Sequence, residues 1–469
     1  METIVLYPSP GMGHLVSMVE LGKLFLHHHP SVTINILTVP PSFNTGSTAS
    51  YISHVSAAVP SITFHHLPAI PLDLHAFPSM EAVIFETLGR SGPHVRHALE
   101  SIKASSGGIS AFIIDFFCTS SHPIATELNI PTYYFITSGA AVFAFFLYFP
   151  TIHSTTTESF KDMKNTLLDV PGLPLFPASD MMVPLLDRES VDYKSFLEFS
   201  LNIPNSAGIM INTFESLETK CLQTIREGKC NPNGKTPPVF TVGPLLATAA
   251  GEAAHDCLKW LDKQPSKSVV YLCFGSLGLL SEAQLKEIAL GLEKSSHRFL
   301  WVVRSPPTTD ESKRFLPPEE PDLGLLLPDG FLDRTEGRGL VVKSWAPQVA
   351  VLGHESVGGF VTHCGWNSVL EAVCAAVPMV AWPLYAEQKF NRAVLVEEMK
   401  VAVRMDEDEG GFVASEEVER RVREIMETEK GKEIRRVVEE RSSEAKAAMA
   451  DGGSSVVALG KLIESWSKV

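Results

Sequence analysis

The chain has 469 residues, a formal net charge of −15 at pH 7 and a 45% share of hydrophobic residues. Its length exceeds the roughly 250–300 residues at which single hydrophobic cores stop growing, which predicts two domains. The negative charge argues against a nucleic-acid partner, whose phosphates require a basic face. The seven cysteines are scattered and form no Cys-x-x-Cys pair, which indicates reduced thiols and a cytoplasmic location.

Short strand-like apolar runs alternate with helical segments along the chain. The runs lie at residues 4–7, 33–39, 111–115, 209–212, 269–274, 299–303 and 358–363. Alternation of this kind predicts an α/β fold with parallel sheets covered by helices on both faces. Two such series are expected, at residues 1–243 and 255–450, joined by a linker at 244–254 and followed by a last helix within 451–469.

Three further segments have a composition of their own. The apolar run at residues 140–149 is much shorter than the ~20 residues a membrane-spanning helix needs, and we expect a buried helix that ends at Pro150. The N-terminus lacks the basic region and cleavage site of a targeting segment. Residues 305–329 are rich in proline and acidic residues without periodicity, which predicts a surface loop.

Two residues of the first series, His14 and Asp115, follow or end strand-like runs. Ligands of open α/β sheets lie outside the carboxyl ends of the strands, so both side chains are candidates for one site. The simpler alternatives are a loop histidine and a capping aspartate. The Gly11-x-Gly13 pair lacks the third glycine of a dinucleotide fingerprint. The histidine runs lack cysteine or carboxylate partners at ligand spacing, so no metal is expected.

The most informative segment is residues 345–388. A strand-like run ends at His363, and a helix is expected to begin near Trp366, which leaves free backbone N–H groups suited to a phosphate. The side chains of His363, Asn367 and Ser368 add donors, and Glu371 on the same helix face can accept from ribose hydroxyls. The alternative is that Ser368-x-x-Glu371 is only a capping box.

The two ends of this segment extend the same site. Trp345 offers a flat face on which a base can stack, although tryptophan is more often a core residue. Ala346 and Gln348 supply backbone and amide groups beside it, and Glu387 and Gln388 can bond adjacent hydroxyls. A nucleotide, a diphosphate and a sugar could therefore be bound in that order.

Residues 345–388 closely resemble the signature box of plant UDP-sugar-dependent glycosyltransferases. The resemblance implies a GT-B fold of two Rossmann-like, doubly wound domains that face a cleft. The N-terminal domain would bind the acceptor, the C-terminal domain would bind the UDP-sugar, and the last helix would pack back on the N-terminal domain. One departure is Glu387, where many members have aspartate. The matching positions are Trp345, Gln348, His363, Gly365, Trp366, Asn367, Ser368, Glu371, Glu387 and Gln388.

The resemblance also implies a role for each group of residues. The uracil and ribose would contact Trp345, Ala346, Gln348 and Glu371; the diphosphate would contact Ser276, His363, Gly365, Asn367 and Ser368; and the sugar would contact Thr137, Trp366, Glu387 and Gln388. His14 would be the general base and Asp115 its partner. The acceptor pocket would include Phe117, Phe143, Phe146, Met181 and Met182.

The implied reaction is inverting transfer of glucose from UDP-glucose to a hydroxyl of a small phenolic acceptor, such as a flavonoid or chalcone. It would give a β-glucoside without a metal or other cofactor. C-glycosylation of an electron-rich phenolic ring and O-glucosylation of terpenoids stay open as alternatives. A hypothesis of another class is a catalytically silent UDP-sugar binder. A monomer without integral membrane association is expected.

Overall fold

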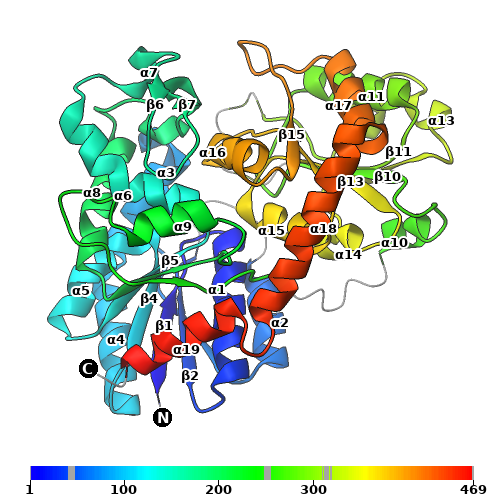
Figure 1. Cartoon of the computed structure of the whole chain (residues 1–469). Coiled ribbons are helices and arrows are strands. Elements are labelled where there is room, and N and C mark those ends of the chain that lie inside the picture. The colour runs from blue at the N-terminus through cyan, green and yellow to red at the C-terminus, as the bar shows by residue number, and fades with distance from the viewer. Residues whose placement is uncertain are drawn as a thin grey trace. The chain divides into compact units, whose positions relative to one another are not determined.

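The computed structural model describes residues 2–40, 48–247, 255–308, 310, 316 and 319–466. The chain divides into two compact units, which Figure 1 shows with their elements labelled. The first unit contains residues up to Leu246 and those from Ala447 onward, and the second contains Ala247–Lys446. Most of the linker predicted at 244–254, namely residues 248–254, lies outside the described residues.

Among its described residues the first unit contains a seven-stranded, all-parallel sheet, in the order β3-β2-β1-β4-β5-β8-β9. The direction of strand addition reverses between β1 and β4. In an open α/β sheet, the carboxyl ends at such a reversal form the usual ligand site. The strands are β1 (Thr3–Tyr7), β2 (Thr33–Thr38), β3 (Ile62–His66), β4 (Ala111–Asp115), β5 (Thr132–Ile136), β8 (Gly208–Ile211) and β9 (Val239–Thr241).

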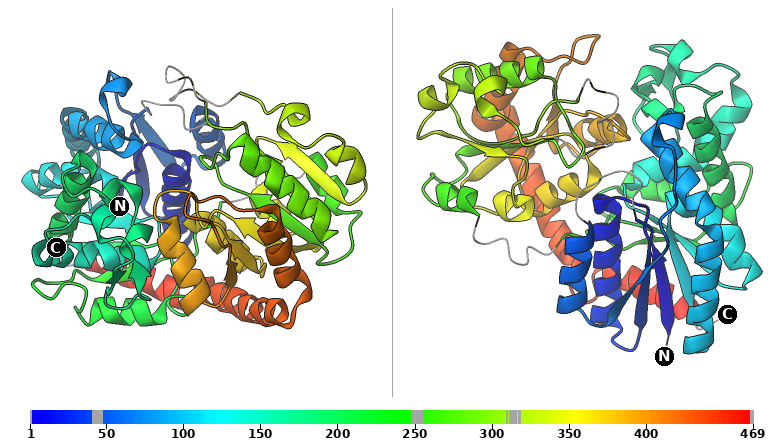
Figure 2. Two further views of the ribbon diagram at one scale, coloured as in Figure 1. Left: turned by 90° about the horizontal axis from the view of Figure 1, so that it is seen from above. Right: turned by 180° about the vertical axis from the view of Figure 1, so that it is seen from behind.

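Helices cover both faces of this sheet (Figure 2). The antiparallel pair β6 (Leu167–Leu168) and β7 (Phe176–Pro177) forms a separate small ribbon. The helices are α1 (Met12–His28), α2 (Thr48–Ala58), α3 (Met80–Arg90), α4 (Gly92–Ser106), α5 (His122–Glu127), α6 (Ala140–Thr155), α7 (Phe160–Met163), α8 (Val191–Asn202) and α9 (Thr219–Arg226).

The helix predicted to end at Pro150 is longer than expected, because α6 continues through the proline to Thr155. Proline removes one backbone donor, which destabilises a helix interior. The aromatic side chains of Phe143, Phe145 and Phe149 are fully buried along α6. Burial of these side chains offsets the missing hydrogen bond, so tertiary packing overrides the local signal of the proline.

The last helix, α19 (Ser454–Trp466), packs within the first unit. Its apolar side chains join the core formed by β1, β2 and α1. The rings of Trp466 and Phe25 lie 5.5 Å apart, and the hydroxyl of Ser455 donates to the carbonyl of Gly243 at 2.6 Å. The last helix predicted within residues 451–469 thus corresponds to α19, which completes this core.

The described part of the second unit contains a six-stranded parallel sheet, in the order β12-β11-β10-β13-β14-β15. Its strand order reverses between β10 and β13. The strands are β10 (Val269–Cys273), β11 (Arg298–Val303), β12 (Gly339–Lys343), β13 (Val357–Thr362), β14 (Met379–Ala381) and β15 (Ala402–Arg404). The helices are α10 (Asp256–Leu261), α11 (Glu282–Ser295), α12 (Leu323–Leu326), α13 (Phe331–Arg334), α14 (Gln348–Leu352), α15 (Trp366–Cys374), α16 (Gln388–Ala393) and α17 (Ser415–Glu427), followed by α18 (Glu429–Met449), which belongs to this unit up to Lys446.

All seven predicted strands are present, at β1, β2, β4, β8, β10, β11 and β13. The loop predicted at 305–329 is partly wrong, since α12 forms within it, capped by the side chain of Asp322. Among the described residues no helix combines the length and the apolar character needed to cross a bilayer.

Candidate functional site

The first unit brings His14 and Asp115 together at the carboxyl ends of β1 and β4. Nδ1 of His14 lies 2.7 Å from Oδ2 of Asp115, which is fully buried. The other carboxylate oxygen, Oδ1, accepts the backbone N–H of Phe117 at 3.1 Å. Because the buried carboxylate can only accept, Nδ1 must donate, and this tautomer leaves Nε2 as the basic nitrogen. The predicted pairing of these two residues is therefore present in the structure.

Two aromatic rings lie beside this histidine. The ring of His14 lies 5.8 Å from that of Phe117 and 6.0 Å from that of Phe116. Both belong to what we call the ring cluster, whose members pack at centroid separations such as 5.5 Å between Phe146 and Phe196. This cluster consists of Phe85, Phe116, Phe117, Phe146, Phe196 and Phe199.

The predicted acceptor residues are distributed unevenly around His14. Phe117 and Phe146 belong to the ring cluster, whereas Phe143 is fully buried in α6, and Met181 and Met182 are buried in the segment before α8. Four members of the ring cluster were not predicted from the sequence: Phe85, Phe116, Phe196 and Phe199. Phe116 directly follows Asp115, so its place beyond a strand end was an available signal.

Thr137, predicted to contact the sugar, also lies beside the pair. Its hydroxyl is 3.4 Å from Nδ1 of His14. Thr137 does not cap the helix that follows it, because Gly139 occupies the cap position of α6. The structure thus groups Thr137 with His14 and Asp115 at one edge of the first sheet.

In the second unit, β13 leads into α15 through His363, Cys364 and Gly365. Gly365 is the N-cap of α15, without a side-chain cap hydrogen bond. The capping-box alternative is therefore wrong: Ser368 lies inside the helix, and its hydroxyl accepts from Nε2 of Gln348 at 2.8 Å. A helix start capped by glycine suits an anion, because its dipole and N–H groups attract negative charge.

His363 lies between two glycines at this helix start. A Cβ atom added at Gly275 or Gly365 would lie 2.4 or 2.5 Å from its Nε2, so a larger residue at either position would displace the imidazole. The side chain is buried, and among the described residues its Nδ1 has no hydrogen-bond partner. Burial lowers the pKa of His363 from 6.5 to about 4. His363 is therefore neutral at pH 7 and can donate a hydrogen bond without carrying a charge.

This depressed pKa predicts an acid-sensitive contribution to stability. Between pH 6.5 and about 4 the unfolded chain binds a proton that the folded chain excludes, so the free energy of unfolding falls as the pH falls. The expected loss is about 2 kcal/mol at pH 5. Urea midpoints at pH 7.5 and 5.0 should therefore differ less in His363→Gln than in the parent. If the urea midpoint shifts equally between pH 7.5 and 5.0 in both proteins, the lowered pKa of His363 is contradicted.

The neighbouring polar side chains connect α14 and α15. Nε2 of Gln348 also donates to Oε2 of Glu371 at 2.6 Å, so α14 and α15 are joined through Gln348. Trp345, just before α14, is 55% exposed and meets the ring of His255 edge-on at 5.8 Å. An exposed tryptophan face is available to a planar ligand. Ala346 beside it is buried.

The last predicted residues lie where β14 leads into α16. Oε1 of the buried Gln388 accepts the backbone N–H groups of Leu384 and Tyr385, at 2.8 and 2.9 Å. Glu387 is half-buried and Trp366 is buried at the start of α15. The side chain of Gln388 therefore holds its own loop in shape.

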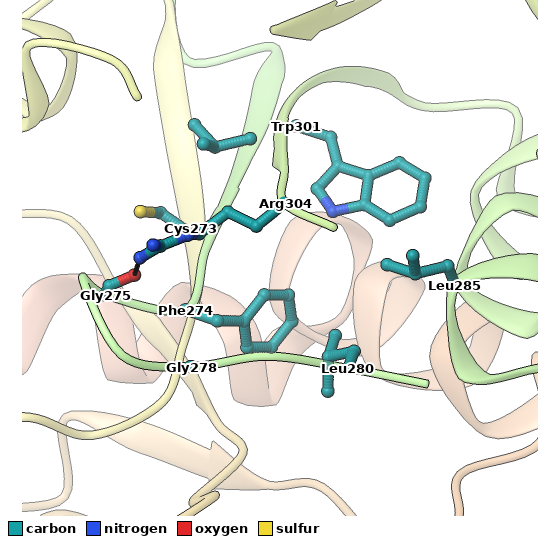
Figure 3. Close-up of a pocket in the computed structure, with 9 residues that line it drawn as sticks. Cys273, Phe274, Gly275, Gly278, Leu280, Leu285, Trp301 and Arg304 are labelled. Carbon is teal, nitrogen blue, oxygen red and sulfur yellow. Dashed lines mark hydrogen bonds between the residues drawn. The ribbon is translucent and has the colours of Figure 1, made fainter. Parts of the chain in front are cut away.

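Ser276 is exposed in the loop after β10, and this loop is held by an unpredicted residue, Arg304. Nη1 of Arg304 donates to the carbonyl of Ser276. It also donates to the carbonyl of Gly275 at 3.2 Å, the hydrogen bond drawn in Figure 3. Burial lowers the pKa of Arg304 from its ordinary value. Arg304 follows β11, which neighbours β10, so the rule that ligand-site residues follow strands could have found it.

The cavity drawn in Figure 3 is small. It is lined by Cys273, Phe274, Trp301 and Arg304 among others, and its volume of about 10 Å³ suits one water at most. It is therefore no substrate pocket. Among the described residues, no group of three or more His, Cys, Asp and Glu side chains could hold a metal ion.

Comparison with known proteins identifies the chain. Residues 214–438 match the family described as UDP-glucoronosyl and UDP-glucosyl transferase. Over 482 aligned residues the chain is 51% identical to a phloretin 2'-O-glucosyltransferase of Malus domestica, with 99% of each chain covered. The chain belongs to this UDP-glycosyltransferase family. It is also 50% identical to an anthocyanidin 5,3-O-glucosyltransferase of a Rosa hybrid cultivar, with 100% and 99% covered.

The solved structures agree with this membership. Phytolacca americana UGT2, complexed with UDP-2fluoro-glucose and pterostilbene, is 38% identical and superposes with a TM-score of 0.88 over 100% of both chains. The protein is thus a UDP-sugar-dependent glycosyltransferase with the GT-B fold predicted from its sequence. The glycosyltransferase carries His14, Asp115 and Thr137 in its first unit, and the residues of its signature box in its second.

Proposed function

We propose that the enzyme transfers glucose from UDP-glucose to a hydroxyl of a small phenolic acceptor of the flavonoid or chalcone type, with inversion. The observation that carries this proposal is the contact of 2.7 Å between His14 and the fully buried Asp115. A phenol has a pKa near 10 and is largely unionised at pH 7, so it needs a positioned base. The pair provides one at a strand-order reversal, where ligands of α/β sheets bind.

In the proposed reaction, Nε2 of His14 takes the phenolic proton as the oxygen attacks the anomeric carbon. The new carbon–oxygen bond forms while the bond from that carbon to the diphosphate oxygen breaks, and UDP leaves with the bonding electrons. Asp115 orients the imidazole and stabilises the imidazolium that forms. Attack opposite the diphosphate converts an α-linked donor sugar into a β-glucoside, without a covalent enzyme intermediate.

The donor is assigned to the second unit. Trp345 stacks on uracil, with Ala346 and Gln348 beside it, and Glu371 accepts from the ribose. The diphosphate bonds the start of α15 together with His363, Ser276, Asn367 and Ser368. Two observations support this assignment: Nδ1 of His363 has no hydrogen-bond partner within the described part of the chain, and the cap of α15 is the glycine Gly365. These donors can stabilise the leaving UDP without a metal.

The sugar and the acceptor are assigned with support from the relatives. Thr137, Trp366, Glu387 and Gln388 contact the glucose. The relatives named for phloretin and anthocyanidin are glucosyltransferases, and the Phytolacca structure holds pterostilbene. The ring cluster beside His14 suits planar aromatic acceptors, which pack favourably against phenylalanine rings. None of the seven cysteines, all of which lie in the described ranges, forms a disulfide, which supports a cytoplasmic enzyme.

The test is a product analysis with the purified enzyme. UDP-glucose is offered with phloretin, an anthocyanidin or a terpenoid alcohol, with and without EDTA. We expect a phenolic O-glucoside whose anomeric proton coupling indicates the β configuration and whose yield EDTA does not change. An acid-resistant product would indicate C-glycosylation instead. UDP binding without turnover of any acceptor would indicate a silent UDP-sugar binder.

The assignment of Glu371 predicts a defect that depends on the ribose. Its carboxylate already accepts from Gln348 at 2.6 Å, so it is held in place to accept from hydroxyls. Glu371→Ala should weaken UDP binding about tenfold, as expected for one charge-assisted hydrogen bond. Glu371→Ala should weaken the binding of one analogue, 2'-deoxy-UDP or 3'-deoxy-UDP, by a smaller factor, because that analogue lacks the hydroxyl that Glu371 bonds. Calorimetric titration measures the affinity of parent and variant for all three ligands. Equal losses of affinity for the three would contradict the ribose contact.

A further inference from the structure

A turn of unusual backbone conformation precedes α15. Cys364 has a φ of 66°, in the left-handed region that residues other than glycine rarely adopt. Its side chain is fully buried, and its backbone N–H donates to the hydroxyl of Thr362 at 3.2 Å. Such a conformation persists only where surrounding contacts hold it, and it often marks a functional site.

The contact that holds this turn comes from α16. Nδ2 of Asn391 donates to the carbonyl oxygen of Cys364 at 2.9 Å, across 27 residues of sequence. Asn391 is 1% exposed. A buried amide that spans two elements has little rotational freedom, so it fixes the carbonyl that it bonds.

The geometry of the peptide bond links this contact to Gly365. The carbonyl of Cys364 and the N–H of Gly365 belong to one planar trans peptide, so they point in opposite directions. Fixing the carbonyl toward Asn391 therefore turns the N–H of Gly365 away from α16. Gly365 is the N-cap of α15, and the neighbouring His363 has its buried Nδ1 without a partner among the described residues.

We propose that Asn391 is a positioning residue for the donor diphosphate, acting through the left-handed turn at Cys364. The inference rests on the proposed binding of the diphosphate at the start of α15. In this proposal Asn391 acts through its hydrogen bond to the Cys364 carbonyl and not by bonding the phosphates itself. Its role is to keep the Cys364–Gly365 peptide plane in the orientation in which the N–H of Gly365 and the first turn of α15 can face the phosphates.

The first test compares ligands with and without phosphates. Asn391→Ala should weaken inhibition by UDP about tenfold, the size expected for loss of one buried hydrogen bond. Inhibition by uridine should change less than twofold, because the base and ribose contacts of Trp345, Gln348 and Glu371 do not depend on the turn. Equal losses for both ligands would overturn the proposal, since they would indicate general loosening of the second unit.

The second test is a rescue at the turn itself. Glycine adopts a positive φ without steric cost, so Cys364→Gly in the Asn391→Ala background should restore most of the UDP affinity. The matched control is Ala376→Gly, which also replaces a left-handed residue, with a φ of 58°, at the other end of α15. Rescue by both glycines, or by neither, would overturn the proposal.

A third variant covers the case in which Asn391→Ala fails to fold. Asn391→Asp keeps the volume of the side chain but places a carboxylate against the Cys364 carbonyl, where two acceptors repel. It should show the same selective loss for UDP over uridine and the same rescue by Cys364→Gly. Asn367→Ala, at a residue assigned directly to the diphosphate, separates the two ways in which the proposal can fail. If UDP does not bind at the start of α15, Asn367→Ala and the Asn391 variants will all keep the parental UDP affinity while glucosyl transfer persists. If only the role of Asn391 is wrong, Asn367→Ala will weaken UDP binding while the Asn391 variants keep the parental affinity.

Discussion

Replacement of His14 by alanine should lower kcat/KM for a phenolic acceptor by about 10²- to 10⁴-fold, the usual contribution of a positioned general base. The affinity for UDP should be unchanged, since the residues assigned to the nucleotide all lie in the second unit while His14 lies in the first. Inhibition by UDP and steady-state kinetics measure the two quantities on the same preparation. A parallel fall in both would indicate a structural role for His14.

The acidity of the acceptor provides an internal control for this variant. A phenol that is already ionised at the assay pH has no proton for the base to remove. The defect of His14→Ala should therefore shrink along a series of increasingly acidic phenols of similar size. A defect of constant size across the series would contradict proton transfer to His14.

The grouping of polar side chains at the start of α15 could be predicted because those residues are contiguous in the sequence. The strand ending at His363 and the helix from Trp366 could be recognised by their period, and the side chains between them had to gather at that helix start. The fold also placed His14 and Asp115 together, 101 residues apart, because both follow strands that flank the same reversal of strand order.

Arg304 and Asn391 were missed for the opposite reason. Each acts on a carbonyl of the backbone, Arg304 at Gly275 and Asn391 at Cys364, from 29 and 27 residues away. Any residue presents a carbonyl, so the sequence of the accepting segment has no signal for these contacts. The position of Arg304 directly after β11 marked it as a candidate, but which carbonyls Arg304 and Asn391 bond depends on tertiary packing, which the sequence pattern does not show.

The differences between the predicted and the observed fold have local physical causes. Strands β9, β14 and β15 are three residues long, too short for a two-residue period to stand out. Strand β3 ends in His65 and His66, whose polar side chains hide its apolar start. Pro150 indicated a helix end, yet the buried aromatic side chains of α6 carry the helix past it.

The second large effect is expected from Asp115→Asn, a change that keeps the size of the buried side chain. The carboxylate accepts two N–H groups, from Phe117 at Oδ1 and from His14 at Oδ2. Asparagine has a single oxygen. If that oxygen keeps the backbone N–H of Phe117, the amide NH₂ faces Nδ1 of His14, which must then become an acceptor. The proton moves to Nε2, and the imidazole can no longer take a proton from the phenol.

This change of tautomer should lower kcat by about 10²- to 10⁴-fold while the acceptor KM and the UDP affinity change little, as for other histidines whose carboxylate partner becomes an amide. NMR of ¹⁵N-labelled histidine distinguishes the two tautomers directly, and thermal unfolding shows whether the fold is intact. Asp115→Ala is the contrasting variant: it leaves both donors without their acceptor and should lower stability as well as activity. Near-parental activity of Asp115→Asn, with Nδ1 still protonated, would mean that the amide had rotated to favour His14 over Phe117. Asp115 would then orient His14 by accepting a hydrogen bond, and its charge would contribute little to stabilising the imidazolium.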